Sequence, residues 1–250
     1  MAASESSPDP NDVAVLVPAA GSGRRMGGTP KQFRRLGEQS VLLQTLLLFE
    51  QHPTVGHAVV AAPSDRVQAV SDRLRAEGLR LLTAVVEGGD SRQASVRHAL
   101  RAVPDWVTTV LVHDAARPFV SAAAIEAVVQ AVQVEGAASL AVPVADTVRR
   151  GADETFGDPV PREDLYRTQT PQGFRRSWLD EAHRRGAEDE IRATDDVALV
   201  QRLGHDVRIV EGHRRNFKIT TPDDWTLAQQ LWPAWRDDPE RTRIPSPEAS

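Results

Sequence analysis

The chain has 250 residues, a formal net charge of −5, a pI of about 5.8 and no cysteine. Without an overall basic field it is not expected to bind nucleic acid, and the lack of cysteine excludes disulfides and thiolate zinc sites. The amino-terminal segment has neither a basic region nor an apolar run, and no stretch could span a bilayer. We therefore expect a cytoplasmic protein without a membrane partner.

Residues 1–12 and about 234–250 are rich in Pro, Ser and charged side chains and lack apolar periodicity, so we expect both to be disordered. A single domain is predicted between them, over 13–233. Its expected strands, in chain order, are 13–17, 57–62, 81–86, 108–112 and 137–142. Helices are expected to begin after Ser40, Ser64, Ser121 and Thr221, the last one running to about Trp232.

This alternation of strands and helices predicts an α/β fold with a Rossmann-like, mostly parallel sheet, helices on both faces and a ligand crevice at the carboxyl ends of the strands. One segment interrupts the pattern. Residues 144–172 are polar, contain Pro159 and Pro161 and offer no long helical face, which indicates a protruding arm or hairpin. Such arms often reach a neighbouring subunit.

The most informative segment is 13–33, VAVLVPAAGSGRRMGGTPKQF, in which an apolar strand leads into a glycine-rich turn. Gly21 and Gly23 allow a positive φ and close approach of a ligand, and exposed backbone N–H groups would face phosphates. The cations of this segment are Arg24, Arg25 and Lys31. Arginine can grip phosphate oxygens with two hydrogen bonds, and lysine acts as a compact point charge. We interpret the segment as a triphosphate site rather than a solvated surface loop.

Two other phosphate loops do not fit. A Walker loop needs Ser or Thr after its lysine, but Lys31 stands between Pro30 and Gln32. The dinucleotide fingerprint lacks its third glycine, and the strand at 57–62 has no acid at its end to hold a ribose. The chain has only two lysines, Lys31 and Lys218, which favours a role at both that arginine cannot fill.

Two further loops follow predicted strands. The segment 87–95, EGGDSRQAS, suits recognition of a nucleobase edge, although taken alone a simple turn with a serine cap is the favoured explanation. In HDAARP, Asp114 could orient a substrate hydroxyl or approach a magnesium ion, and Arg117 could meet a phosphate. An internal ion pair between the two is the alternative. Thr194 lies before an apolar helix, where capping is the simplest role.

Together, several motifs in this order resemble the cytidylyltransferases of the non-mevalonate isoprenoid pathway. They are PAAGSGRRM, PKQF, EGGDSRQASV, VHDAARPF, PVADTV, RTQTPQGF, ATDDVALV and EGHRRNFKITTPDDW. The resemblance implies a nucleotidyltransferase domain of the glycosyltransferase-A type and a homodimer with exchanged arms. It also implies magnesium and the condensation of CTP with 2-C-methyl-D-erythritol 4-phosphate, with release of pyrophosphate.

The resemblance assigns roles by motif position. Transition-state stabilisers would be Arg25 and Lys31. The nucleotide would contact Pro18, Ala19, Ala20, Gly21, Gly23, Gly89, Asp90, Ser95 and Ala115. The acceptor would contact Asp114, Arg117, Thr170, Thr194 and Lys218, with Thr147 and Arg162 from the partner's arm. Magnesium would be held mostly by CTP, with Asp114 as a candidate ligand. The alternatives are a ribitol 5-phosphate cytidylyltransferase, another sugar-nucleotide pyrophosphorylase, or a catalytically silent nucleotide-binding protein.

Overall fold

A computed structural model of the chain describes residues 12–21 and 30–245. The expected disorder of 1–11 and 246–250, and the roles expected of Gly23, Arg24 and Arg25, fall outside these residues. In the described part of the chain, no helix combines the length and the apolar character needed to cross a membrane.

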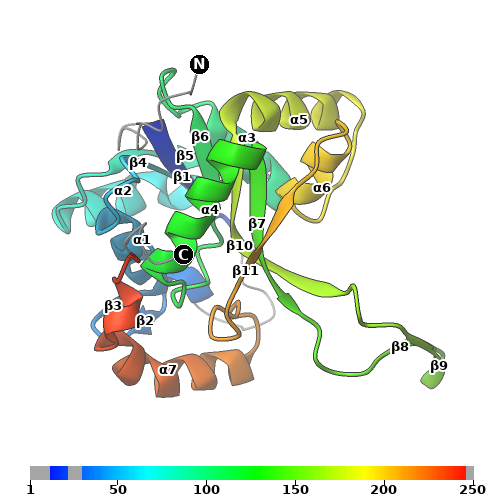
Figure 1. Cartoon of the computed structure of the whole chain (residues 1–250). Coiled ribbons are helices and arrows are strands. Elements are labelled where there is room, and N and C mark those ends of the chain that lie inside the picture. Colours follow the sequence, from blue (N-terminus) through cyan, green and yellow to red (C-terminus); the bar gives the residue numbers. More distant parts are fainter. Residues whose placement is uncertain (1–11, 22–29, 246–250) are drawn as a thin grey trace.

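A seven-stranded sheet forms the centre of the molecule (Figure 1). Its strands, in spatial order, are β11 (Arg208–Glu211), β7 (Ala137–Pro143), β10 (Tyr166–Arg175), β6 (Thr109–Val112), β1 (Val13–Pro18), β4 (His57–Ala62) and β5 (Leu82–Glu87). Every neighbouring pair is parallel except those made by β10, which runs antiparallel to both β6 and β7. The prediction of a mostly parallel α/β sheet is therefore confirmed.

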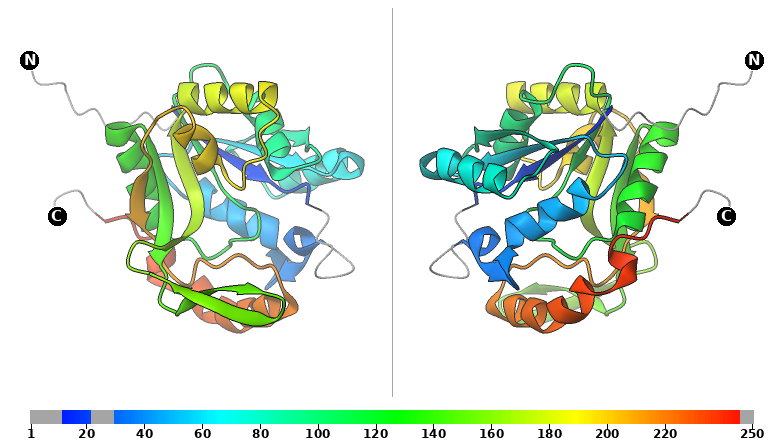
Figure 2. Two further views of the ribbon diagram at one scale, coloured as in Figure 1. Left: turned by 90° about the vertical axis from the view of Figure 1, so that its right-hand side faces the viewer. Right: turned by 90° about the vertical axis from the view of Figure 1, so that its left-hand side faces the viewer.

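Helices cover both faces of this sheet (Figure 2). One face carries α1 (Val41–Glu50), α2 (Val67–Ala76) and α4 (Ala122–Glu135), and the other carries α3 (Arg92–Leu100), α5 (Arg176–Glu188) and α6 (Asp196–Gln201). Strand β1 serves both layers because successive side chains point to opposite faces. Val13 and Val15 belong to the first core, and Ala14 and Leu16 to the second. All four are fully buried, as expected for a parallel strand covered on both sides.

The helix starts follow the predicted capping residues. The Ser40 and Ser121 side chains each accept a hydrogen bond from the backbone three residues on, at the starts of α1 and α4. Ser64 instead opens a short 3-10 turn, η4 (Ser64–Arg66), and α2 begins after it without a side-chain cap. Thr221 forms a full capping box with Asp224 at the start of α7 (Pro222–Arg236).

The carboxyl-terminal region is more ordered than its composition predicted. Helix α7 continues to Arg236 and is followed by η5 (Pro239–Arg241). Trp232 and Trp235 are buried in a third core, and the Arg241 guanidinium lies over the Trp232 ring. The prediction of a disordered tail from about 234 is therefore wrong for residues 234–245. Trp232 and Trp235 lie one helical turn apart, so the buried face of α7 continues past the expected boundary at 233. Beyond Trp235 the segment is held by polar and cation–π contacts such as that of Arg241, which leave no apolar periodicity in the sequence.

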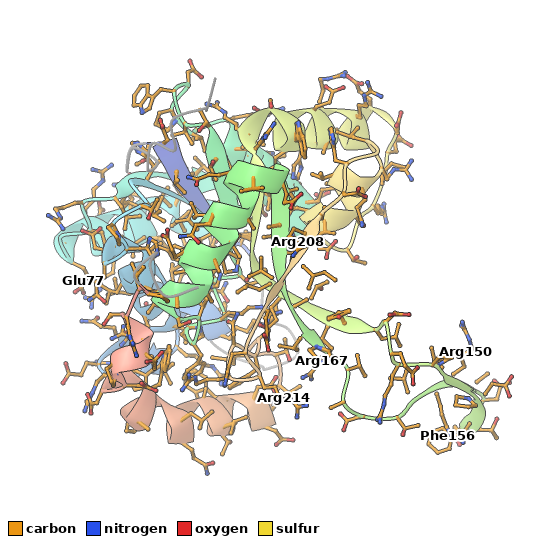
Figure 3. The ribbon with its side chains drawn as sticks, in the orientation of Figure 1. Glu77, Arg150, Phe156, Arg167, Arg208 and Arg214 are labelled. Atoms are coloured by element: carbon orange, nitrogen blue, oxygen red, sulfur yellow. The ribbon has the colours of Figure 1, made fainter. Side chains whose placement is uncertain are left out.

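The predicted arm is a β-hairpin made of β8 (Val148–Ala152) and β9 (Thr155–Val160). It projects away from the body, with Arg150 and Phe156 on its outer part (Figure 3). Its expected end at 172 is wrong, because β10 starts at Tyr166 and belongs to the central sheet. The polar stretch QTPQGF within β10 resembles a loop in sequence, but its buried side chains find hydrogen-bond partners in segments distant in sequence.

The remaining short elements lie between β1 and α1. They are η3 (Lys31–Phe33), β2 (Arg35–Leu36) and β3 (Gln39–Ser40). Gly37 connects the two short strands with a φ of 66°, close against the Trp232 ring. This packing joins the segment that carries Lys31 to the carboxyl-terminal helix.

Candidate active site

A cleft of about 670 Å³ lies where β1, β5 and β6 end at one edge of the sheet. Most of the sequence-predicted site residues that the structure describes line it: Pro18, Ala19, Ala20, Gly21, Lys31, Gly89, Asp90, Ser95, Asp114, Ala115 and Lys218. These residues come from segments far apart in the chain. The topology brings them together because parallel strands place their carboxyl ends at the same edge.

The turn after β1 is held by Gln32, a buried residue to which the sequence analysis gave no role. Its Nε2 donates hydrogen bonds to the carbonyl oxygens of Ala19, at 2.6 Å, and Gly21, at 2.8 Å. The segment after Pro30 is thereby tied to the turn, and Lys31 is placed beside it. Gly21 does not have the positive φ that we expected, and a Cβ there would meet no atom of residues 12–21 or 30–245 within 4 Å. Gly21 lines the cleft, so the reason that remains for glycine is the close approach of a ligand, as the sequence predicted.

The second wall follows β5 and approaches the first closely. A Cβ on Gly88 would lie 2.2 Å from the Cβ of Ala20, so only glycine fits there without a shift. The Ser95 hydroxyl accepts a hydrogen bond from the Gly89 N–H at 3.1 Å and donates one to the Ser91 carbonyl at 2.8 Å. Ser91 caps α3, so the capping interpretation of this segment is correct alongside its place in the cleft.

Asp114 lies at the centre of a cluster of cations. Its Oδ2 is 2.9 Å from Lys218 Nζ and 3.3 Å from Arg117 Nε, and its Oδ1 is 3.2 Å from Arg92 Nε. Burial alone would raise the pKa of Asp114, but the charges of Lys218, Arg92 and Arg117 outweigh it and hold the pKa far below its usual range. Asp114 is therefore an ionised carboxylate at every physiological pH.

A neutral histidine fixes the loop that carries Asp114. Burial lowers the pKa of His113 to about 4, so the ring is uncharged near neutral pH. Its Nε2 lies 3.1 Å from the Arg117 carbonyl and must donate, which leaves Nδ1 to accept from the Thr170 hydroxyl at 3.2 Å. That hydroxyl accepts in turn from the Asp114 N–H at 3.1 Å. Thr170 thus contacts the site, but through the Asp114 backbone.

Several predicted acceptor residues do not line this cleft. Arg117 points to Asp114 and to the Asn216 carbonyl, so the ion-pair alternative is confirmed. Thr194 is exposed, and its neighbour Asp195 caps α6. Thr147 and Arg162 lie exposed at the base of the hairpin, where the Arg162 guanidinium donates to the Ala145 carbonyl.

Five further residues line the cleft that the sequence analysis did not select: Gln32, Ser91, Arg92, Ala116 and Thr220. All five stand inside the quoted motifs, within two residues of a selected one. The sequence does not show which side chains of a motif point into the cleft, because the packing around each turn decides this.

The described residues do not form a magnesium site. Both oxygens of Asp114 contact cations, which would repel a divalent ion. Over residues 12–21 and 30–245, no three His, Cys, Asp or Glu side chains gather as a metal site would require. The cations around Asp114 therefore argue against this residue as a magnesium ligand.

Comparisons with known proteins agree with this geometry. The family model of IspD, 2-C-methyl-D-erythritol 4-phosphate cytidylyltransferase, matches residues 13–232. The enzyme of that name from Salinibacter ruber is 68% identical over 238 residues, which are 95% of this chain and 100% of the relative. The one from Deinococcus radiodurans is 44% identical, over 87% of this chain and 88% of the relative.

Solved structures give the same result. The crystal structure of 2-C-methyl-D-erythritol 4-phosphate cytidylyltransferase from Thermus thermophilus superposes with a TM-score of 0.75 at 40% sequence identity. The superposed residues cover 87% of this chain and 96% of the Thermus thermophilus chain. The chain belongs to the 2-C-methyl-D-erythritol 4-phosphate cytidylyltransferase family.

Proposed function

We propose that this protein transfers CMP from CTP to 2-C-methyl-D-erythritol 4-phosphate, releasing pyrophosphate, in isoprenoid precursor biosynthesis. One observation carries the proposal: a single cleft is lined by the start of the glycine-rich turn, Lys31, and the Asp114 carboxylate with its partner Lys218. The start of the turn and Lys31 suit a triphosphate, whereas Asp114 and Lys218 suit a polyol phosphate. The family of the chain supports both assignments.

The nucleotide occupies the part of the cleft lined by the turn after β1 and the segment after β5. Ala20, Gly21, Gly89 and Asp90 line this part of the cleft. In the proposed complex the backbone of Ala20 and Gly21 meets the phosphates, and Gly89 and Asp90 meet the base. Lys31 neutralises charge on the triphosphate, together with Arg25 from the preceding turn. Magnesium comes bound to CTP as part of the substrate.

The acceptor lies beside Asp114. A carboxylate has about four lone-pair sites, and contacts with Arg92, Arg117 and Lys218 use three of them. The remaining site accepts a hydrogen bond from an acceptor hydroxyl. Lys218, with 37% of its side chain exposed, has further N–H groups for the acceptor phosphate.

The reaction joins two polyanions. An oxygen of the acceptor phosphate attacks the α-phosphorus of CTP, a new P–O bond forms, and the bond to the β-phosphate oxygen breaks so that pyrophosphate leaves. The attacking oxygen is already ionised at neutral pH, so no general base is needed. The protein's contribution is to align the two anions and to offset their repulsion with fixed cations.

The hairpin residues act in a second subunit. Thr147 and Arg162 lie outside the cleft of their own chain, and Phe156 on the hairpin is 85% exposed. An apolar ring at the end of a projecting hairpin fits an interface between two copies of the chain. We infer a homodimer in which each hairpin brings Thr147 and Arg162 to the partner's acceptor site.

The test of function measures pyrophosphate release from CTP with 2-C-methyl-D-erythritol 4-phosphate, and with ribitol 5-phosphate as the competing acceptor. Release with the first acceptor alone supports the proposal. A preference for ribitol 5-phosphate would change the acceptor, and no release with any acceptor would favour a silent nucleotide-binding protein. Mixing Asp114→Asn and Arg162→Gln chains tests the dimer, because activity should return only if one subunit completes the other's site.

A further inference from the structure

Arg92 connects the cleft to a buried polar chain behind it. Its Nε is 3.2 Å from Asp114 Oδ1, and its Nη1 is 2.6 Å from Asp196 Oδ2. Asp196 is 1% exposed and does not line the cleft, whereas Arg92 does. A single guanidinium thus bridges a carboxylate that faces the substrate and one that does not.

Asp196, the buried partner of Arg92, is held by two further hydrogen bonds. Asp196 Oδ1 accepts a hydrogen bond of 2.9 Å from His183 Nε2, and the Asp196 N–H donates to Gln172 Oε1 at 3.2 Å. His183 is 2% exposed, and its Nδ1 is buried with no hydrogen-bond partner among the described residues. Holding Asp196 is therefore the one hydrogen-bonding function that the structure gives to this ring.

Arg92 and the other two cations hold different oxygens of Asp114. Lys218 and Arg117 both contact Oδ2, while Arg92 supplies the contact that the structure records for Oδ1. Without Arg92, the carboxylate would keep its Oδ2 partners but could turn about its Cβ–Cγ bond. The lone pair left for a substrate hydroxyl would then lose its fixed direction.

Arg92 occupies a position in α3 that is unfavourable for a cation. It is the first residue of the helix, where the positive end of the helix dipole disfavours a cation. An arginine there does not serve the helix itself. Its two carboxylate partners account for the residue and its orientation.

We propose that Arg92 is a positioning residue, held by Asp196 and His183, that sets the direction of the Asp114 carboxylate and with it the affinity for the polyol phosphate acceptor. This inference rests on the proposed function. It concerns the acceptor half of the cleft and leaves recognition of the triphosphate unchanged.

The experiment measures steady-state pyrophosphate release with each substrate varied in turn. Arg92→Gln should raise the KM for 2-C-methyl-D-erythritol 4-phosphate about tenfold or more, as expected for loss of a hydrogen bond to a charged group. The KM for CTP should stay within about twofold, since a group acting through Asp114 does not touch the nucleotide. Arg92→Lys should recover part of the acceptor affinity, because an ammonium keeps the charge but cannot fork between two carboxylates.

Arg176→Gln is the matched control. The side chain of Arg176 is 17% exposed, against 24% for Arg92, and it also contacts two carboxylates, those of Asp105 and Asp180. It lies outside the cleft. This variant should leave both KM values unchanged even if it lowers the melting temperature.

The bridge itself is tested with Asp196→Asn. This variant should raise the acceptor KM in the same direction, and the double variant with Arg92→Gln should be no worse than Arg92→Gln alone. The inference would be overturned if Arg92→Gln left the acceptor KM unchanged or raised both KM values equally. It would also be overturned if the effects of Arg92→Gln and Asp196→Asn multiplied in the double variant. Failure of the wild-type chain to release pyrophosphate would instead refute the proposed function.

Discussion

Replacing Asp114 with asparagine removes the one negative charge that three cations share. The shape of the side chain is kept. Lys218, Arg92 and Arg117, which each lie 2.9 to 3.3 Å from an Asp114 oxygen, then repel one another without a shared negative charge between them. Asp114 is 7% exposed, so water screens this repulsion poorly. Removing one partner of a buried ionic cluster typically destabilises a protein by about 3–5 kcal/mol. We expect Asp114→Asn to lower the free energy of unfolding by about that amount at pH 7.

The loss of stability in Asp114→Asn should depend on pH in a defined direction. The pKa of Asp114 is lowered in the folded protein, so the unfolded chain takes up this proton first as the pH falls. The stabilisation is thus fully present well above the unfolded pKa of about 3.9 and is lost as the pH falls below it. The difference between wild type and variant should be constant from about pH 8 to pH 5 and should shrink only in more acidic solution.

Urea unfolding followed by circular dichroism measures this difference at each pH, with Asp105→Asn as the control. Asp105 also contacts an arginine, at 3.5 Å, but its carboxylate is fully exposed, so its loss should not change stability measurably. If Asp114→Asn were no more destabilising than Asp105→Asn, the cations would not be held by this carboxylate. A difference that changed strongly between pH 8 and pH 5 would also contradict the reasoning.

Three further predictions concern other parts of the cleft and its support. Lys31→Ala should lower kcat about a hundredfold or more, because fixed charge offsets the repulsion between the two substrates, and near-normal turnover in the pyrophosphate assay would refute this role. Gly88→Ala should raise the KM for CTP several-fold, since its Cβ would lie 2.2 Å from that of Ala20, and an unchanged KM would show that the walls can separate freely. Gly37→Ala should lower the free energy of unfolding by more than about 1 kcal/mol, since φ is 66° there and a Cβ would lie 2.4 Å from Trp232 Nε1; an unchanged urea midpoint would contradict it.

Much of the fold could be predicted because the signals were local. The strands β1, β4 and β6 are continuous apolar runs, and each marks a strand buried on both faces. Ser40, Ser121 and Thr221 start helices by bonding to their own backbone a few residues on, which needs no tertiary partner. Strand β10 was missed because its polar buried residues find partners in segments distant in sequence.

The same distinction holds for the candidate site. The loops that carry Gly21, Gly89, Asp90 and Asp114 were identified because each follows a predicted strand, and strand ends meet at one edge, whereas Pro18, Ala19 and Ala20 were assigned by the family resemblance. Arg92 and Gln32 were overlooked although they stand in the same motifs. Their hydrogen-bond partners distinguish them: Arg92 contacts Asp114, 22 residues away in the sequence, and Gln32 contacts Ala19, 13 residues away.

The sequence by itself determined the alternating strands and helices as far as β7, the family and the chemistry of the loops, because periodicity, capping and motif spacing act over a few neighbouring residues. Only the tertiary structure decided that Asp114 is an anion shared by three cations rather than a metal ligand, since those cations come from α3, the loop after β6 and the segment before α7. Ionic contacts act over a few ångströms of space, and folding brings distant parts of the chain within that range.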